Sequence, residues 1–327
     1  MNTEQPQSTT NKVAIALQEG FAMSPKKLPS WLFYDRTGDK IFTEIMEMPS
    51  YYLSRCESEI FTNQYRELGL EFSNNGKSFD LIELGAGDGR KTEVLLHNFL
   101  DSGIGFRYIP IDISPNVLKL LESRLEKNLP GLNLRTIAMD YQETELLFNQ
   151  LENSHRKVIL FLGSNIGNMD PNNSVRYIAK IADSMNEEDL LMVGFDLVKD
   201  PRIILNAYDD PEGITARFNY NILDRLNREL DANFDSMQFS HYPLYDPAEA
   251  TAKSYLISKR DQEITIGFTG STYRLKKWEC IQTEMSQKYS DTHIKELAAV
   301  AGLSIYRQFE DSKGYYRNVL FSKTPAS

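Results

Sequence analysis

A glycine-rich stretch between an apolar run and a helical pattern has the clearest chemistry in this sequence. Residues 81–92 read LIELGAGDGRKT, with Gly85, Gly87 and Gly89 ahead of the helical pattern that starts near Lys91. Glycine permits a tight turn and lets a ligand approach the main chain closely. The first N–H groups of the following helix then face that ligand. The pattern predicts a strand, a turn and a helix that together bind a nucleotide-containing ligand.

Two other interpretations of the glycine stretch stay open at this point. It also fits a purely structural turn, or a dinucleotide site. The spacing is G-x-G-x-G, whereas dinucleotide folds carry G-x-G-x-x-G. Glu83 is a charge within the apolar run. A buried carboxylate is costly unless it is hydrogen-bonded, so we expect Glu83 to hold the glycine loop.

Acidic residues end the next two expected strands. Asp112 ends the strand at 106–111, where an acid can accept hydrogen bonds from two ribose hydroxyls. Asp140 ends the strand at 134–139, and with Tyr141 it suits an adenine amino group and ring. Each acid alone can equally cap a helix. Together with the glycine turn they resemble the seven-stranded S-adenosylmethionine (SAM)-dependent methyltransferases more than dehydrogenases.

Strands and helices alternate around these motifs. We expect strands near 79–84, 106–111, 134–139, 157–163 and 188–195, and helices near 91–101, 115–127, 142–151 and 173–185. Such alternation with apolar strands predicts a parallel sheet covered on both faces. A helix at 290–301 and a hairpin at 303–321 complete the sheet.

Asn168 follows the fourth strand, in the segment SNIGN. Ligands of open α/β sheets bind beyond the carboxyl ends of the strands. An asparagine side chain both donates and accepts hydrogen bonds, as a substrate carboxylate or ammonium requires. The alternative is an asparagine that only stabilises a turn.

Composition excludes several classes of protein. The chain has 327 residues, with 41% hydrophobic and 25% charged residues, as in ordinary globular proteins. Its net charge of −10 argues against a nucleic-acid partner. No apolar run approaches the ~20 residues that span a bilayer, and the N-terminus lacks a signal core. Two cysteines and four histidines are scattered, so we expect no metal site. We therefore expect a cytoplasmic protein without a membrane partner. We also expect a monomer, although composition does not bear on oligomeric state.

Several segments in order resemble the histidine-specific N-alpha methyltransferase family, whose best-known members trimethylate histidine to hercynine in ergothioneine synthesis. The matching stretches are LFYDRTGDKIFTEI, PSYYLSR, ELGAGDGRKT, FLGSNIGN, DLVKD, AYDDPEGITARFNYNIL and TEMSQKY. The resemblance implies an α/β, Rossmann-like methyltransferase sheet with a second, substrate-binding α+β domain. It places the methyltransferase domain at 62–197 and 289–327, and the substrate domain at 13–61 and 198–288. Residues 1–12 are expected to form a disordered tail.

The resemblance also assigns site residues. Cofactor contacts fall on Tyr34, Gly85, Lys91, Asp112, Asp140 and Tyr141. Substrate contacts fall on Tyr51, Asn168, Tyr208, Glu284, Met285 and Ser286. Asn168 and Tyr208 would bind the amino-acid carboxylate, and Glu284 and Ser286 the imidazole. Tyr51 would close that pocket, and with Asn168 it would position the reactants, since no catalytic acid or base is evident.

Purely structural roles are the alternatives for several of these residues. Glu284 could form an exposed ion pair with Lys288 four residues later on a helix, and Tyr208 could cap a turn. Tyr34 and Tyr51 could be core aromatics.

The function expected from the resemblance is transfer of up to three methyl groups from SAM to the α-amine of L-histidine. Ser254 stands where we expect a larger apolar residue facing the pocket. A different substrate, an aromatic or indolic amino acid, therefore stays an alternative. Two other hypotheses are a non-catalytic protein that binds SAM or an amino acid, and a nicotinamide-dependent reductase.

Overall fold

The chain forms two compact units, each assembled from separate segments. The structure, a computed structural model, describes residues 5–139, 148 and 155–324. The residues up to Tyr52 join Lys199–Gln287 in one unit, called here the accessory unit. Leu53–Val198 and Lys288 onward form the other, the glycine-loop unit. The first boundary thus lies after Tyr52, earlier than the expected position after residue 61.

The glycine-loop unit is built on a seven-stranded sheet with the order β12-β13-β6-β5-β2-β3-β4. The strands are β2 Phe79–Leu84, β3 Phe106–Asp112, β4 Ile137–Ala138, β5 Arg156–Phe161, β6 Leu190–Asp196, β12 Leu303–Glu310 and β13 Tyr316–Lys323. The strands β2 to β6 pair in parallel, and β13 is antiparallel to both neighbours. The expected parallel sheet with a final hairpin is confirmed, although β4 is shorter than expected.

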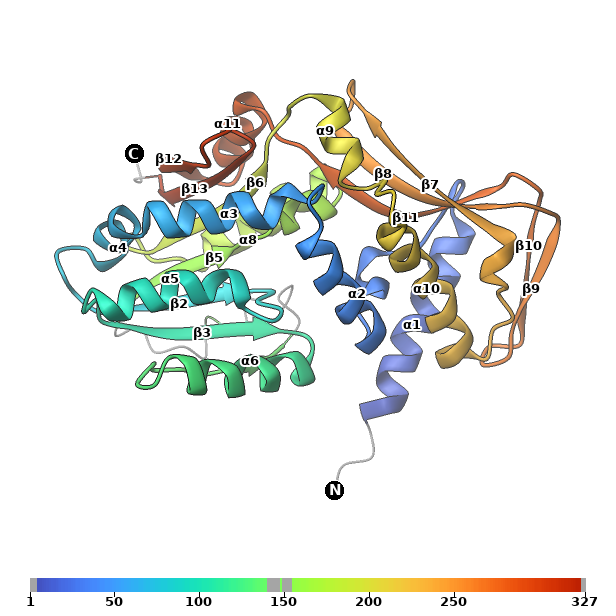
Figure 1. The fold of residues 1–327 in the computed structure, drawn as a ribbon, viewed down its shortest axis with the longest axis horizontal. Coiled ribbons are helices and arrows are strands. Elements are labelled where there is room, and N and C mark those ends of the chain that lie inside the picture. Colours follow the sequence, from blue (N-terminus) through green and yellow to red (C-terminus); the bar gives the residue numbers. More distant parts are fainter. Residues whose placement is uncertain (1–4, 140–147, 149–154, 325–327) are drawn as a thin grey trace. The chain divides into compact units, whose positions relative to one another are not determined.

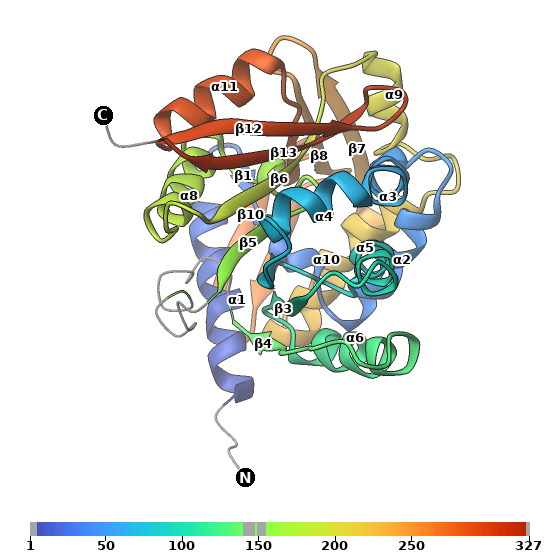
Figure 2. The same ribbon diagram turned by 90° about the vertical axis from the view of Figure 1, so that its left-hand side faces the viewer.

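Helices cover both faces of this sheet. They are α3 Tyr52–Asn63, α4 Tyr65–Ser73, α5 Arg90–Asp101, α6 Pro115–Asn128, α8 Pro171–Asp183 and α11 Asp291–Val300. Figure 2 shows α8 and α11 on one side and α5 and α6 on the other. Ile178 and Leu297 pack with Ile159 in the first layer, while Phe72 and Phe99 meet Phe79 edge-on in the second. The helix expected at 142–151 falls almost entirely outside the described residues.

Local signals explain where these helices begin. Ser114 accepts a hydrogen bond from the Val117 N–H at the start of α6, and Pro115 occupies the first helical position. Ser290 caps α11 in the same way, with His293 completing a reciprocal pair of bonds. No helix in the described part of the chain is long and apolar enough to cross a membrane.

The accessory unit combines helices with a mixed four-stranded sheet and an antiparallel pair of strands (Figure 1). Its elements are α1 Gln5–Ala22, β1 Lys26–Lys27, η1 Ser30–Phe33, α2 Arg36–Glu47, α9 Pro201–Asn206, α10 Ile214–Leu230, η4 Ser236–Gln238, β7 Phe239–Asp246, β8 Thr251–Ser258, β9 Gln262–Ile266, β10 Ser271–Leu275 and β11 Cys280–Gln287. One sheet has the order β1-β11-β8-β7, and β9 pairs with β10 in another. The strands expected at 252–257 and 263–268 are present. Helix α1 begins at Gln5, so residues 5–12 are helical and not part of the expected disordered tail, and residues 1–4 lie outside the described residues.

Helix α10 organises the core of the accessory unit. It packs against α1 and α2 and supplies Phe218 and Leu226 to a buried cluster. Leu17 from α1, Leu256 from β8 and Ile281 from β11 complete this cluster. Because each unit buries its own apolar residues, each presents its candidate site residues on a packed framework.

Candidate active site

The glycine loop follows β2 and is attached to the end of β3. The N–H groups of Gly85 and Ala86 lie 2.9 and 3.0 Å from the Ile111 carbonyl oxygen. Gly85, Gly87 and Gly89 have φ values of 69°, 57° and 67°, in the left-handed region that favours glycine. A Cβ at Gly87 would meet nothing within 4 Å. The predicted tight turn is therefore present, and at Gly87 the backbone is open to a ligand.

Asp112 is bound to that loop. Its two carboxylate oxygens accept bonds from the Gly87 and Ser114 N–H groups, each at 2.9 Å. Burial raises the pKa of Asp112 above its usual value, although the N–H groups of Ser114, Gly87 and Ile113 oppose the rise. A carboxylate oxygen can accept a second hydrogen bond, so this acid fits a ligand that brings hydroxyl donors. Asp140 and Tyr141 lie outside the described residues.

Glu83 is buried at the end of β2, but its hydrogen-bond partners in the described structure lie in α5 and β3 and not in the glycine loop that it was expected to hold. Its carboxyl accepts a 2.8 Å bond from Thr92 Oγ1 and a short one from the Tyr108 hydroxyl. Burial raises the pKa of Glu83 to about 7, against the opposing effects of these hydroxyls and of Lys91. Glu83 thus supports the first turn of α5, directly after the glycine loop.

Lys91 and Asn168 belong to neighbouring strand ends of the glycine-loop unit. The Lys91 ammonium lies 3.1 Å from the buried Glu57 carboxylate. A Cβ at Gly163 would come within 2.8 Å of the same ammonium. Gly163 follows β5 and leads into the short helix η3 Asn165–Asn168, whose last residue is half-buried. The carboxyl ends of β2 and β5 therefore bring Lys91 close to the segment that carries Asn168.

In the accessory unit, Glu284 lies on β11 opposite Ser254 of β8. The Ser254 hydroxyl, which is fully buried, donates a 3.0 Å bond to Glu284 Oε2. Since 284 lies in a strand, the alternative of a helical ion pair with Lys288 is wrong, and Lys288 Nζ lies 2.8 Å from Asp196 Oδ2.

Strand alternation divides the three substrate candidates of β11. Glu284 and Ser286 face the same side, opposite Ser254 and Ala252, whereas Met285 pairs with Lys253 and points to the other side. The structure therefore groups Glu284 with Ser286 and separates Met285 from them.

Tyr208 is buried directly after α9. The adjacent turn is capped by Asp210, whose carboxylate accepts bonds from Ile214 N at 2.7 Å and Thr215 N at 2.8 Å. Asp210 therefore caps the start of α10.

His241 of β7 was not singled out in the sequence. Its Nε2 is buried without a hydrogen-bond partner in the described part of the chain. Burial lowers the pKa of His241 to about 4, opposed by Asp209 and Asp210. A lone histidine between polar residues carries no sequence signal for this environment.

Tyr34 and Tyr51 belong to one aromatic cluster in the accessory unit. The Phe42 ring centroid lies 5.5 Å from that of Tyr34 and 6.3 Å from that of Tyr51, both edge-on. Phe218 of α10 lies 5.9 Å from Tyr34. Tyr34 remains 41% exposed, so part of its ring is available to a ligand.

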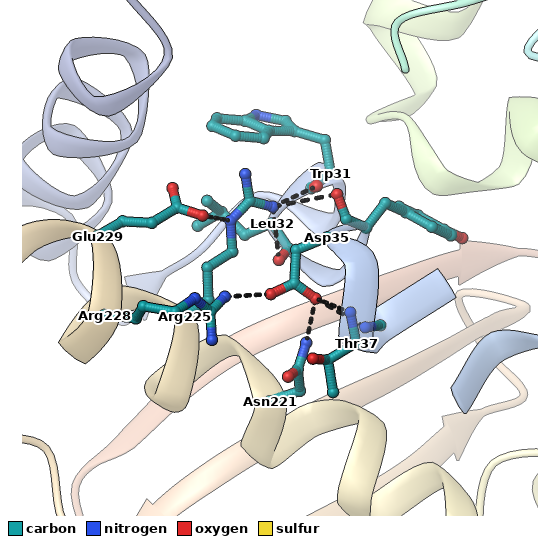
Figure 3. A network of polar contacts seen from close by, with 10 residues as sticks. Trp31, Leu32, Asp35, Thr37, Asn221, Arg225, Arg228 and Glu229 are labelled. Carbon is teal, nitrogen blue, oxygen red and sulfur yellow. Dashed lines mark hydrogen bonds and ion pairs between the residues drawn. The ribbon is translucent and has the colours of Figure 1, made fainter. Parts of the chain in front are cut away.

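The backbone around Tyr34 is anchored to α10 by Arg225 (Figure 3). Its Nη1 donates to the carbonyl oxygens of Trp31, Leu32 and Tyr34 at 3.4, 3.0 and 3.3 Å. Glu229 accepts from Arg225 Nε at 3.0 Å. A single guanidinium thus holds the η1 turn that leads to Tyr34.

Asp35 completes this anchor at the start of α2. One carboxylate oxygen accepts bonds from Thr37 N, Gly38 N and Asn221 Nδ2 at 3.1, 2.7 and 2.9 Å, and Arg228 pairs with the other (Figure 3). Burial works to raise the pKa of Asp35, but these donors outweigh it and lower the pKa below its usual value.

The sheet order and the glycine loop define the class of this protein, an α/β SAM-dependent methyltransferase. Comparison with known proteins then identifies its family. Residues 13–323 match the family of histidine-specific, SAM-dependent methyltransferases. The chain belongs to this family.

Named relatives agree with the family. A histidine N-alpha-methyltransferase of Mycobacterium tuberculosis is 32% identical over 93% of this chain and 92% of its own length. Ergothioneine biosynthesis protein 1 of Schizosaccharomyces pombe is 27% identical over 91% of this chain and 39% of its own length. N-methyltransferase imqF of Aspergillus flavus is 24% identical over 91% of this chain and 81% of its own length.

Proposed function

We propose that this protein transfers methyl groups from SAM to the α-amino nitrogen of L-histidine, up to three times, giving the trimethylated product hercynine. One observation carries the proposal. The Glu284 carboxylate accepts a hydrogen bond from Ser254, and Glu284 lies on the same face of β11 as Ser286. In a histidine-specific family, an acceptor and a hydroxyl two residues apart suit the two nitrogens of an imidazole.

Residues of the glycine-loop unit fit the cofactor. Asp112 can accept from ribose hydroxyls, the open backbone at Gly87 can face the ligand, and the Lys91 ammonium can pair with the ligand's carboxylate. Tyr34, a partly exposed residue of the accessory unit, remains a predicted cofactor contact. Asp140 and Tyr141 remain predicted adenine contacts. When bound, SAM supplies a methyl group made electrophilic by its sulfonium.

The substrate residues have separate tasks. Glu284 accepts from one imidazole N–H, Ser286 serves the other nitrogen, and Tyr51 closes this pocket. Asn168 and Tyr208 bind the amino-acid carboxylate. Both are neutral donors, so they hold an anion without placing a further cation beside a sulfonium. Because Met285 faces away from Glu284, we leave it out of the imidazole pocket.

The protein would act mainly by positioning. The attacking amine must be neutral, and the residues above can hold it in line with the methyl group and exclude water. We assign no general base. We also propose that the protein acts as a monomer, which light scattering after gel filtration tests.

Mass spectrometry of products tests the function. Purified protein is incubated with SAM and the twenty amino acids together. Histidine carrying three added methyl groups supports the proposal. Methylation of a different amino acid overturns the imidazole pocket, and absence of any methylated product despite SAM binding favours a non-catalytic binding protein.

A second substrate class is favoured by one observation. Ser254 is a small side chain directly opposite Glu284, where a larger apolar residue would fill more of the pocket. An aromatic or indolic amino acid is therefore the alternative. The same mixture reveals it as a methylated tryptophan, tyrosine or phenylalanine.

A further inference from the structure

A fully buried carboxylate, Glu57 of α3, lies at the carboxyl end of the sheet in the glycine-loop unit. It accepts a 2.8 Å bond from the Tyr316 hydroxyl of β13 and 3.1 Å bonds from the Gly163 N–H. The Lys91 ammonium lies 3.1 Å from its Oε2 atom. One side chain thus joins α3, α5, the end of β5 and the final hairpin.

Two glycines leave the space that these contacts need. A Cβ at Gly194 in β6 would lie 2.1 Å from the Tyr316 hydroxyl and 2.8 Å from Glu57 Oε1. A Cβ at Gly163 would lie 2.8 Å from the Lys91 ammonium. A side chain at Gly194 would displace the Tyr316 hydroxyl or the Glu57 carboxylate, and one at Gly163 would displace the Lys91 ammonium from its present position.

Tyr316 extends the network to the segment that carries Asn168. Its hydroxyl accepts a 2.9 Å bond from Ser164 N, and Ser164 Oγ accepts a 3.2 Å bond from Asp196 N. Ser164 has a φ of 57° and immediately precedes η3. A non-glycine residue in this conformation is strained, so these bonds hold the turn in place.

Burial of the carboxylate is costly unless it is fully paired, and apolar residues of the same volume would often be as stable. The Lys91 side chain, unlike that of Glu57, is 29% exposed. A lysine has three N–H donors on a flexible stem, and a fixed stem loses less entropy when it binds an anion. The network therefore presents an ammonium that is already oriented.

We propose that Glu57 is a positioning residue: it holds the Lys91 ammonium in place for the carboxylate of the cofactor's amino-acid half. Tyr316 ties this arrangement to the turn before Asn168. The inference rests on the proposed function, because it takes SAM as the ligand of this unit.

Calorimetric titration of Glu57→Gln with two ligands tests the role. S-adenosylhomocysteine carries the amino-acid half, whereas 5′-methylthioadenosine lacks it. Glutamine keeps the shape of Glu57 but removes the charge that orients Lys91. We expect the Kd of S-adenosylhomocysteine to rise at least fivefold and that of methylthioadenosine to stay within twofold. Lys91→Met should show the same selectivity. The double variant Glu57→Gln/Lys91→Met should lose no more affinity for S-adenosylhomocysteine than Lys91→Met alone.

Glu59→Gln is the matched control, since Glu59 lies on the same helix and accepts a bond from Ser312 N on the surface. It should bind both ligands like the wild type. If Glu57→Gln does not fold, Tyr316→Phe is tested in its place. We expect this variant also to weaken S-adenosylhomocysteine binding selectively, but by a smaller factor. Equal weakening of both ligands, or a lower melting temperature with an unchanged ratio of Kd values, overturns the positioning role.

The two proposals fail in different ways. A wild-type protein that binds S-adenosylhomocysteine but methylates an amino acid other than histidine overturns the proposed substrate. The ratio of Kd values in Glu57→Gln then still decides the positioning role.

Discussion

Two buried carboxyl groups of the glycine-loop unit, Glu57 and Glu83, are stabilised by different kinds of partner. Glu57 pairs with an ammonium, a hydroxyl and a backbone N–H. Glu83 has only two hydroxyl groups, from Thr92 and Tyr108, as its direct partners in the described structure, and its pKa is raised to about 7 by burial. The second group therefore makes stability depend on pH.

Glu83 should destabilise the fold as pH rises. Between its ordinary pKa of 4.5 and about 7, the native carboxyl keeps a proton that the unfolded chain loses. The contribution of Glu83 to the free energy of unfolding therefore falls by on the order of 3 kcal/mol as pH rises through this range. Urea denaturation of Glu83→Gln and wild type at pH 5 and pH 8 measures it. We expect the variant to gain stability relative to wild type at pH 8, and parallel pH curves would contradict this.

Glu284 should control histidine affinity. Glu284→Ala removes a charged acceptor worth about 1.5–3 kcal/mol, so the KM for histidine should rise at least tenfold while the Kd of S-adenosylhomocysteine stays unchanged. Steady-state kinetics and calorimetry check both values. Unchanged histidine turnover would remove Glu284 from the pocket.

Ser254 should act through Glu284. Ser254→Ala removes the 3.0 Å bond to the carboxylate and should raise the histidine KM in the wild-type background. In the Glu284→Ala background the same change should have no effect, because the acceptor is gone. Additive effects in this double-mutant cycle would show that the two side chains act independently.

At the scale of elements, α2 depends on a cap that also reaches α10. Asp35 accepts from the N–H groups of Thr37 and Gly38, as an ordinary N-cap does. It also accepts from Asn221 and pairs with Arg228, both on α10. One carboxylate therefore fixes both the start of α2 and its attachment to α10.

Asp35→Ala should lower the free energy of unfolding by about 1–3 kcal/mol, because cap and interhelical bonds are lost together. Asp200→Ala is the control. Asp200 caps the exposed start of α9 and pairs only locally with Arg202 in the described structure, so its loss should be smaller. Chemical denaturation compares the two, and equal losses would show that the contacts of Asp35 with α10 contribute nothing.

At the scale of the molecule, neither unit is continuous in sequence. The glycine-loop unit needs the segment from Lys288 onward, which supplies α11, β12 and β13. That segment also contributes Lys288, fully buried against Asp196 of β6 at 2.8 Å. Removing it strips one edge of the sheet and leaves a buried carboxylate without its cation.

A chain ending at Gln287 should therefore lose cooperative unfolding and S-adenosylhomocysteine binding. Breaking a buried ion pair alone costs about 3–5 kcal/mol. Circular dichroism melting and calorimetry check the two properties. A chain ending at Thr324 is the control and should behave like the full chain. Retained binding in the shorter chain would show that the first strands suffice.

Local patterns in the sequence determined much of the fold. The glycine turn, the acid at the end of β3, the capped starts of α6 and α11 and the strand–helix alternation each depend on residues close together in the chain, where periodicity and capping act. The position of β4 was predicted correctly, but its length was not: the strand was expected at 134–139 and spans Ile137–Ala138. These local features sufficed to predict the methyltransferase sheet.

Only the tertiary structure decided which distant side chains meet. Glu57 and Tyr316 are separated by 259 positions, and a glutamate on an amphipathic helix is ordinarily exposed. The contact between Ser254 and Glu284 depends on strand register and on the bulge between Gln282 and Glu284. The same register turns Met285 away from them. Burial of charge and strand register are set by packing between segments far apart in sequence, so no local pattern contains them.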